Sequence, residues 1–214
     1  MTAHQTSLRS RHGRSTADVA TAVGRLGGTC TWRELRRAVP WRLIGRAVAA
    51  GLVLHPGNGI YALPSAHHGR VAAGRLAGVA SHRTAAVHWG WKVKTVPALP
   101  DVTIPTGRKL RPSAEGVATV HRRTLAATEV SDGWATTPIR TVIDCCLDVP
   151  FDEALSVFDS ALRAGLPRRI VVAATAALGP RHRARVLQVA RYATAKAANP
   201  FESVLRAIAL GVDN

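Results

Sequence analysis

The segment from residue 15 to residue 63 constrains the fold more than any other part of the chain, because strong helix starts alternate in it with strong helix stops. Apolar residues spaced three and four apart predict a helix from Ser15 to Leu26, and two glycines end it. Thr31 and Glu34 have the spacing of a capping box, in which each side chain accepts a hydrogen bond from the backbone N–H of the other residue. A second, short helix therefore begins here and ends near Ala38.

A third helix and a hairpin complete this segment. The pattern predicts the third helix from Trp41 to Ala50, with Leu43, Ala47 and Val48 inward and Arg42, Gly45 and Arg46 outward. Two β-prone runs then flank a Pro-Gly-Asn-Gly turn in the sequence LVLHPGNGIYAL (residues 52–63), which is a strong hairpin signal. Three helices followed by a hairpin is the order of a winged helix-turn-helix, in which the third helix enters the major groove of DNA.

The charge of this segment agrees with DNA binding. Residues 1–64 contain nine arginines and two acidic residues, so nine minus two gives a net charge of +7. Cations that neutralise phosphates release counterions, and this release supplies the affinity that a DNA-binding module needs. We expect Arg42 and Arg46 to reach base edges, because arginine reads guanine with two hydrogen bonds. The other expected DNA contacts are Arg33, Arg36 and Arg37 on phosphates, Trp41 at the third helix, and His55 and Asn58 at the wing. The alternative is an ordinary solvated basic surface.

The whole composition also favours a polyanionic partner. The chain has 214 residues, 47% hydrophobic residues and a formal net charge of +16. This length suits two domains, and the charge favours nucleic acid over an acidic small molecule. A membrane surface is the competing partner, but no long apolar run or secretory signal is present, so the chain is interpreted as cytoplasmic. The three cysteines, Cys30, Cys145 and Cys146, have no metal or disulfide spacing and are expected in the core.

Over the whole chain the sequence predicts a mainly α protein with a small β content, of the α+β class. Residues 1–14 are interpreted as a disordered basic arm, residues 15–64 as the winged helix-turn-helix, and residues 64–69 as a linker. A second, α+β domain follows over residues 70–198, with strands at 102–104 and 117–120 around a basic loop of Arg108, Lys109 and Arg111. Helices are expected from Thr137-Pro138, from Phe151 to Gly165, over 181–198 and over 201–210.

The charge changes sign within the second domain. Residues 127–165 contain seven acidic and two basic residues, which gives −5, whereas residues 166–200 contain seven basic residues and no acid, which gives +7. We expect the acidic part to form a surface for a basic protein partner. The residues assigned to this surface are Asp148, Asp152, Glu153 and Asp159.

No motif in the chain indicates an enzyme, a cofactor or a metal site. A P-loop, a GxGxxG turn, a GxSxG elbow and zinc-ligand spacing are all absent from the sequence. His82 and His88 are six residues apart, which does not place them on one helix face as ligands, so both are interpreted as structural or surface residues. Asp152 and Glu153 are consecutive and complement a helix dipole better than they flank one substrate bond.

Several stretches resemble the AbiEi family of antitoxins, which belong to bacterial type IV toxin-antitoxin systems. The first is AVPWRLIGRAVAAGLVLHPGNGIYALP, residues 38–64, which resembles the family's winged-helix domain. Four further stretches are similar, in order and spacing, to its second domain: ASHRTAAVHWGW (80–91), DVTIPTGRK (101–109), VHRRTL (120–125) and TTPIRTVIDCC (136–146). The resemblance implies a repressor that binds double-stranded DNA at its own promoter and helps neutralise a nucleotidyltransferase toxin.

The last stretch, NPFESVLRAIALG (199–211), resembles the entry helix of a very-short-patch-repair-like endonuclease domain. In that class a glutamate on this helix, matched here by Glu202, assists an Asp and a Glu-x-Lys supplied by a later hairpin, and together they hold a divalent metal. Those later residues are absent from this sequence. A lone carboxylate cannot build a metal site that activates water, so we expect a shortened chain without nuclease activity.

Three functions remain open at this point. The favoured one is a DNA-binding repressor and antitoxin, which requires a toxin encoded beside it. The second is the non-catalytic DNA-targeting remnant of a truncated endonuclease-domain protein, which requires a downstream nuclease reading frame. The third is a basic DNA-binding protein without sequence preference, which requires neither neighbour.

Overall fold

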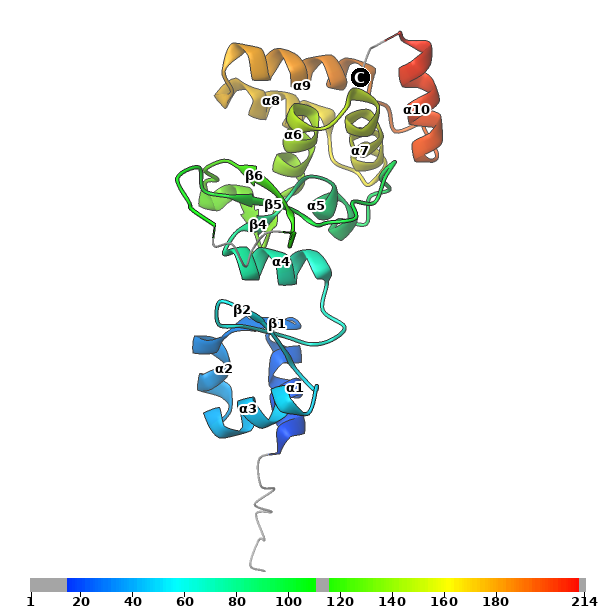
Figure 1. Cartoon of the computed structure of the whole chain (residues 1–214). Helices are drawn as coiled ribbons and strands as arrows, with labels where there is room; N and C mark the ends of the chain where they lie inside the picture. Colours follow the sequence, from blue (N-terminus) through cyan, green and yellow to red (C-terminus); the bar gives the residue numbers. More distant parts are fainter. Residues whose placement is uncertain (1–14, 111–115, 212–214) are drawn as a thin grey trace, which may run out of the picture. The chain divides into compact units, whose positions relative to one another are not determined.

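The computed structural model describes residues 15–110 and 116–211 and shows a mixed α+β protein with two small β-sheets (Figure 1). Contacts divide the chain into two units, Met1–Ala66 and His67–Asn214. The predicted basic arm at residues 1–14 and Arg111 of the predicted basic loop lie outside the described residues. Within the described ranges, no helix has both the length and the apolar composition of a membrane span.

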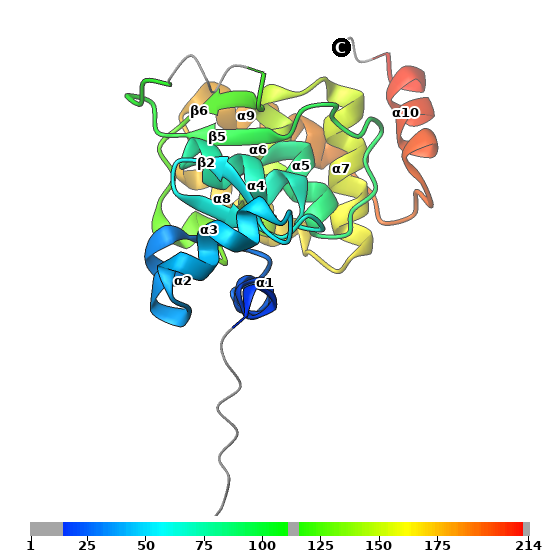
Figure 2. The same cartoon turned by 60° about the horizontal axis from the view of Figure 1, so that its bottom comes forward.

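Over its described residues, 15–66, the first unit contains three helices and a three-stranded sheet. Its elements are α1 (Thr16–Arg25), β1 (Thr29–Thr31), α2 (Trp32–Ala38), α3 (Trp41–Ala49), β2 (Leu54–Gly57) and β3 (Ile60–Ala62). Figure 2 views the unit almost along α1, with α2 and α3 beside it. Val19, Val23, Leu35 and Ile44 are fully buried between the three helices. Leu43 and Val48, both expected inward on α3, are only half-buried, because Ile44 and Ala47 are the residues that turn toward the core.

Local signals fix the starts and turns of this unit as predicted. Thr31 Oγ1 accepts the Glu34 N–H at 3.3 Å and Glu34 Oε2 accepts the Thr31 N–H at 2.8 Å, so the capping box is confirmed. The hairpin of β2 and β3 is also confirmed. Asn58 and Gly59 at its tip have φ angles of +49° and +67°, which is the left-handed conformation that two-residue hairpin turns require.

The second unit has a five-stranded sheet of order β6-β5-β4-β8-β7. The strands are β4 (Val79–Ala80), β5 (Asp101–Ile104), β6 (Thr119–Arg122), β7 (Val130–Ser131) and β8 (Ala135–Thr136). α4 (His68–Leu76) lies on one side of the sheet, and α5 (His82–His88) and α6 (Pro138–Asp148) lie on the other (Figure 1). β5 and β6 pair in parallel, and the second strand begins two residues later than predicted, at Thr119.

A helical layer forms the main core of this unit. Besides α6 it contains α7 (Phe151–Arg163), α8 (Arg168–Ala174), α9 (Pro180–Tyr192) and α10 (Pro200–Ala209), with short 3-10 turns at Ala127–Glu129 and Thr175–Ala177. The predicted start of α6 is confirmed, because Thr137 caps it and Pro138 follows. Leu155 and Phe158 of α7 are fully buried. Cys145 and Cys146 are free thiols in this core, as expected, and burial raises the pKa of Cys145 well above its usual value.

One expectation for the C-terminal region is wrong. α9 ends at Tyr192 rather than at residue 198, because the buried carboxylate of Asp159 accepts the Thr194 N–H and Arg163 donates to the Ala197 carbonyl, which holds this stretch as a loop. α10 packs on α7 through Ser203 and Ala207. Its apolar residues, Phe201, Leu205 and Ile208, consequently lie outward and are exposed.

Gly78 offers a sharp test of the packing between α4 and the sheet. A Cβ atom at this position would lie 2.7 Å from the Thr103 carbonyl oxygen and 2.8 Å from side-chain carbons of both Val102 and Ile104. Because backbone cannot move aside cheaply, we expect Gly78→Ala to lower the free energy of unfolding by roughly 1 to 3 kcal/mol, measured by urea denaturation. Gly107→Ala is the matched control, since nothing lies within 4 Å of its Cβ. Equal stability of the two variants would contradict this packing.

Candidate functional site

The basic side chains predicted to contact DNA lie on the surface of the first unit. Arg33, Arg36 and Arg37 of α2 are exposed, and so are Arg42 and Arg46 of α3. α3 turns Ile44 and Ala47 into the core, so the opposite side of the helix is left for Arg42, Gly45 and Arg46, as predicted. The space beside Gly45 on this side is open, because nothing lies within 4 Å of a Cβ built on this residue.

Aromatic residues flank these cations. Trp41 at the start of α3 is 64% exposed, and the Arg42 guanidinium lies 5.6 Å from the centroid of its ring. On the sheet, the His55 and Tyr61 rings stack with centroids 4.7 Å apart, and Trp32 lies 5.9 Å from Tyr61. His55 and the turn residue Asn58 are both exposed. The first unit therefore presents arginines and planar side chains, two groups that contact phosphates and bases in nucleic-acid complexes.

The acidic residues assigned to a partner surface are placed differently from the prediction. Asp152, Glu153 and Asp159 are 2%, 8% and 0% exposed and point into the second unit. Lys94 pairs with Asp152, Arg83 with Glu153, and Arg206 with Asp159. Only Asp148 of the four is exposed. The prediction of an exposed acidic surface from these residues is therefore corrected, because a charge count along the sequence does not reveal which carboxylates are paired inside the fold.

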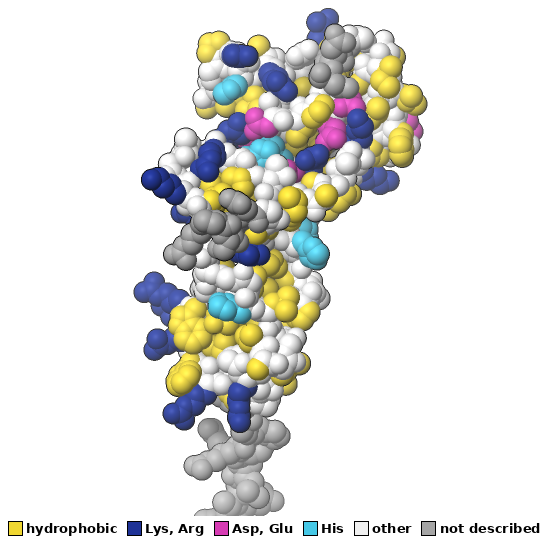
Figure 3. Space-filling view, viewed as in Figure 1, with side chains coloured by type: hydrophobic (Ala, Val, Ile, Leu, Met, Phe, Trp, Pro, Cys, Tyr) yellow, Lys and Arg dark blue, Asp and Glu magenta, His cyan; other side chains and the backbone are white. Residues whose placement is uncertain are grey.

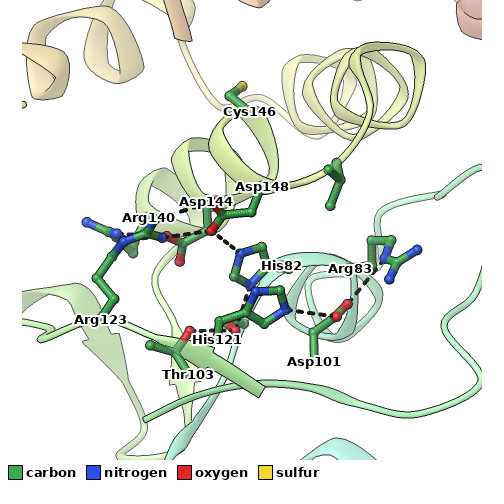
Figure 4. A network of polar contacts seen from close by, with 12 residues as sticks. His82, Arg83, Asp101, Thr103, His121, Arg123, Arg140, Asp144, Cys146 and Asp148 are labelled. Atoms are coloured by element: carbon green, nitrogen blue, oxygen red, sulfur yellow. Dashed lines mark hydrogen bonds and ion pairs between the residues drawn. The ribbon is translucent and has the colours of Figure 1, made fainter. Parts of the chain in front are cut away.

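A network of charged and polar residues lies between α5, β5, β6 and α6 in the second unit (Figure 4). His82 is its centre. Its side chain is fully buried, its Nε2 lies 2.9 Å from Asp148 Oδ2, and its Nδ1 lies 2.8 Å from Ser81 Oγ. His82 also has a φ angle of +48°, a left-handed conformation that costs a non-glycine residue energy and persists only where its surroundings hold it.

His121 stacks on His82 with ring centroids 3.6 Å apart. His121 Nε2 lies 3.1 Å from Asp101 Oδ1, and Arg83 Nε donates to Asp101 Oδ2 at 3.2 Å. Burial disfavours the charged form of Asp101, but the hydrogen bonds from His121 and Arg83 outweigh it and hold the pKa of this carboxyl below its ordinary value. Arg83 continues to Glu153 of α7, so the network joins the sheet to the helical layer.

A second branch surrounds Asp144 on α6. Asp144 Oδ1 accepts from Arg140 at 2.7 and 2.9 Å and from Arg123 at 2.6 Å. Arg140 also donates to Glu129 at 2.8 Å, and Arg123 lies 3.1 Å from Asp148. Burial again opposes ionisation of Asp148, but the His82 hydrogen bond and the charge of Arg123 hold its pKa well below the ordinary value. The network is thus a chain of carboxylates paired with arginines.

The network contains residue types that recur in metal and hydrolase sites, but its geometry fits neither role well. Ligand atoms of His82, His121 and Asp148 lie within 4.8 Å of one another. A metal ion shared by the two histidines would have to lie near the planes of both imidazole rings, and the close stacking of these rings opposes this. The carboxylate of Asp148 is already paired with the Arg123 guanidinium. Ser81, His82 and Asp148 form a Ser-His-Asp chain, yet Ser81 is fully buried, so its hydroxyl cannot meet a substrate.

The sequence interpretation treated His82 as structural or surface and did not connect it with Asp101, His121 or Asp148. A signal was nevertheless present. Four stretches singled out in the sequence, at 80–91, 101–109, 120–125 and 136–146, carry Ser81, His82, Arg83, Asp101, Thr103, His121, Arg123, Arg140 and Asp144. Figure 4 shows residues from all four stretches in one network.

Comparisons with known proteins bear on the fold. No protein-family model matches the chain, and no curated protein matches it. The structure is similar to the crystal structure of the RV2827C protein from Mycobacterium tuberculosis, with a TM-score of 0.50 and 13% sequence identity over 88% of this chain and 78% of that chain. At this identity the similarity concerns the fold alone.

Removing Asp101 tests the stabilising role of the network. Its carboxylate is 1% exposed and faces both Arg83 and His121. Asp101→Asn weakens these two charge-assisted contacts, while Arg83 keeps its pairing with Glu153, and is expected to lower the free energy of unfolding at pH 7 by about 1 to 3 kcal/mol. The folded pKa is lowered, so the stabilisation is present above the unfolded value near 4 and is lost as the pH falls below it. Acidification should therefore destabilise the variant less than the unchanged protein.

The measurement is urea denaturation between pH 7 and pH 3. Asp132→Asn is the control, because Asp132 is exposed and lies outside the network. A free energy of unfolding at pH 7 that is the same for the two variants would contradict a stabilising network.

Proposed function

We propose that the chain is a DNA-binding transcriptional repressor and the antitoxin of a type IV, AbiE-like toxin-antitoxin system, acting in the cytoplasm without enzymatic activity. The observation that carries the DNA-binding part is the exposed row of arginines on α2 and α3 beside a hairpin. The antitoxin part rests on the four sequence stretches that resemble the AbiEi family.

In this proposal the first unit is a winged helix-turn-helix. Its order of three helices and a hairpin, with β1 added beside β3, is that of the fold. α3 is the recognition helix, because its outer side carries Arg42 and Arg46 and no acidic residue. The hairpin tip at Asn58 and the neighbouring His55 form the wing, which touches the DNA backbone or minor groove.

We assign different DNA contacts to α3 and α2. Arg42 and Arg46 lie on the helix that enters the groove, so we assign them to base edges, with the exposed Trp41 ring beside them. Arg33, Arg36 and Arg37 lie on α2, which crosses the backbone in helix-turn-helix complexes, so we assign them to phosphates. Specificity then depends on α3 and overall affinity on both helices.

The proposed absence of enzymatic activity is supported by the contacts of Glu202. This is the residue that matches the metal-binding glutamate of the endonuclease-like relatives. Its Oε2 accepts the Ala198 N–H at 2.9 Å and its Oε1 accepts from Asn199 at 3.0 Å. Asn199 in turn accepts the Glu202 N–H at 3.1 Å. The carboxylate therefore has a structural task, which is to complete the N-terminal cap of α10.

Substitutions on α3 and α2 test this division. Arg46→Ala should cost roughly 1 to 3 kcal/mol of binding free energy on the chain's own promoter and relax its sequence preference, because it removes contacts with base edges. Arg36→Ala should weaken binding to the promoter and to random duplex alike and reduce the salt dependence by about one phosphate contact. Fluorescence anisotropy with both duplexes at several salt concentrations measures the two effects.

Arg36→Ala is also the matched control for Arg46→Ala, since each substitution removes one exposed arginine from the same unit. If Arg46→Ala weakened the two duplexes equally, α3 would not be the recognition helix. The antitoxin part has its own requirement: the gene beside this one must encode a toxin whose effect on growth is relieved when the chain is expressed with it.

A further inference from the structure

The second unit exposes a cluster of basic side chains at α8 and α9 with no acidic residue among them. Residues 160–201 contain no aspartate or glutamate. We define the α8–α9 surface as five exposed cations of this stretch: Arg169, Arg181, Arg183, Arg191 and Lys196. Figure 3 shows dark-blue side chains over α9 at the end of the second unit.

The two acidic residues that border this stretch do not offset the positive charge of the α8–α9 surface. Asp159, the acid that precedes the stretch, is fully buried and held by Ser203 and Arg206. Glu202, the acid that follows it, is engaged in the cap of α10. Asp159 is thus neutralised within the fold, and Glu202 lies on α10 rather than on α8 or α9. Neither α8 nor α9 carries a carboxylate that offsets its cations.

Arg168 and Arg185, which neighbour this surface, make hydrogen bonds that stabilise the fold. Arg185 donates to the carbonyl oxygens of Cys146 at 2.9 Å and Val149 at 3.3 Å, which satisfies the end of α6. Arg168 donates to the Ala193 carbonyl. Both have a task within the fold. Arg181 and Arg183, in contrast, extend from the first turn of α9, where cations oppose the helix dipole and cost stability. Their placement therefore does not serve the helix.

The geometry of α9 suits an extended ligand. Its inner side carries Val186, Val189 and Ala190. Its outer side begins at Arg181 and ends at Arg191, which are ten residues and about 15 Å apart along the helix. Among the large apolar residues of α8 and α9, only Ile170 is exposed, at 37%. Protein interfaces have an apolar centre, whereas nucleic-acid interfaces are strongly positive.

We propose that the α8–α9 surface binds the phosphodiester backbone of a double-stranded nucleic acid. The contact is with phosphates and carries no base preference. It is separate from the recognition of base edges assigned to α3, and it does not require the chain to be a specific repressor. The chain thus has a nucleic-acid contact on each of its two units.

The test compares charge removal on and off this surface in the full chain. Arg181→Gln combined with Arg183→Gln should lower the slope of log affinity against log salt for a random DNA duplex by about 1 to 2, because each lost phosphate contact contributes about 0.9. The control removes two charges elsewhere on the unit through Lys92→Gln and Lys109→Gln, both at exposed positions. It should leave the slope within about 0.5 of the unchanged protein.

A double variant with lysine at both positions keeps the charge and should retain the slope, since lysine also binds phosphate. A random RNA duplex run in parallel identifies which backbone is preferred, and a reduction with either duplex supports the proposal. Equal slopes for the glutamine variants on and off the surface, with both duplexes, would overturn it. Failure of the proposed repressor function would show differently, as equal affinity of the unchanged chain for promoter and random DNA.

Discussion

The second unit depends on the pairing of carboxylates that it buries. Asp101, Asp144, Asp152 and Asp159 are almost completely inaccessible, and a buried charge without a partner costs several kcal/mol. Their partners come from distant elements: Arg83 from α5, Arg123 from the end of β6, Lys94 from the loop before β5, and Arg206 from α10. Each ion pair therefore links two elements of the unit that lie apart in the sequence.

This pairing also decides which charges the protein presents outside. Acidic residues predominate over residues 127–165 of the sequence, yet most of them are neutralised within the unit. Among the residues that the structure describes, no ion pair involves the exposed arginines of α2, α3 and α9. The charge that the protein exposes is therefore mainly positive, although the sequence contains both an acidic and a basic segment. A positive surface is more compatible with a nucleic acid than with a basic protein.

Local signals were predictable from the sequence, whereas contacts between distant residues were not. The capping box at Thr31, the Asn58 turn and the Pro138 helix start each depend on residues within a few positions of one another, and all three are confirmed. The His82–Asp148 contact joins residues 66 positions apart, and no spacing rule connects them. The end of α9 was missed for the same reason, because it is fixed by Asp159 on another helix.

The central claim is that the first unit reads a DNA sequence. Titration of the unchanged chain onto its own promoter fragment and onto random duplex of equal length, at about 150 mM salt, tests it directly. The account predicts a preference for the promoter on the order of 10³ or more, as specific regulators show. Equal affinity for the two duplexes would contradict it and would leave a protein that binds nucleic acid through charge alone.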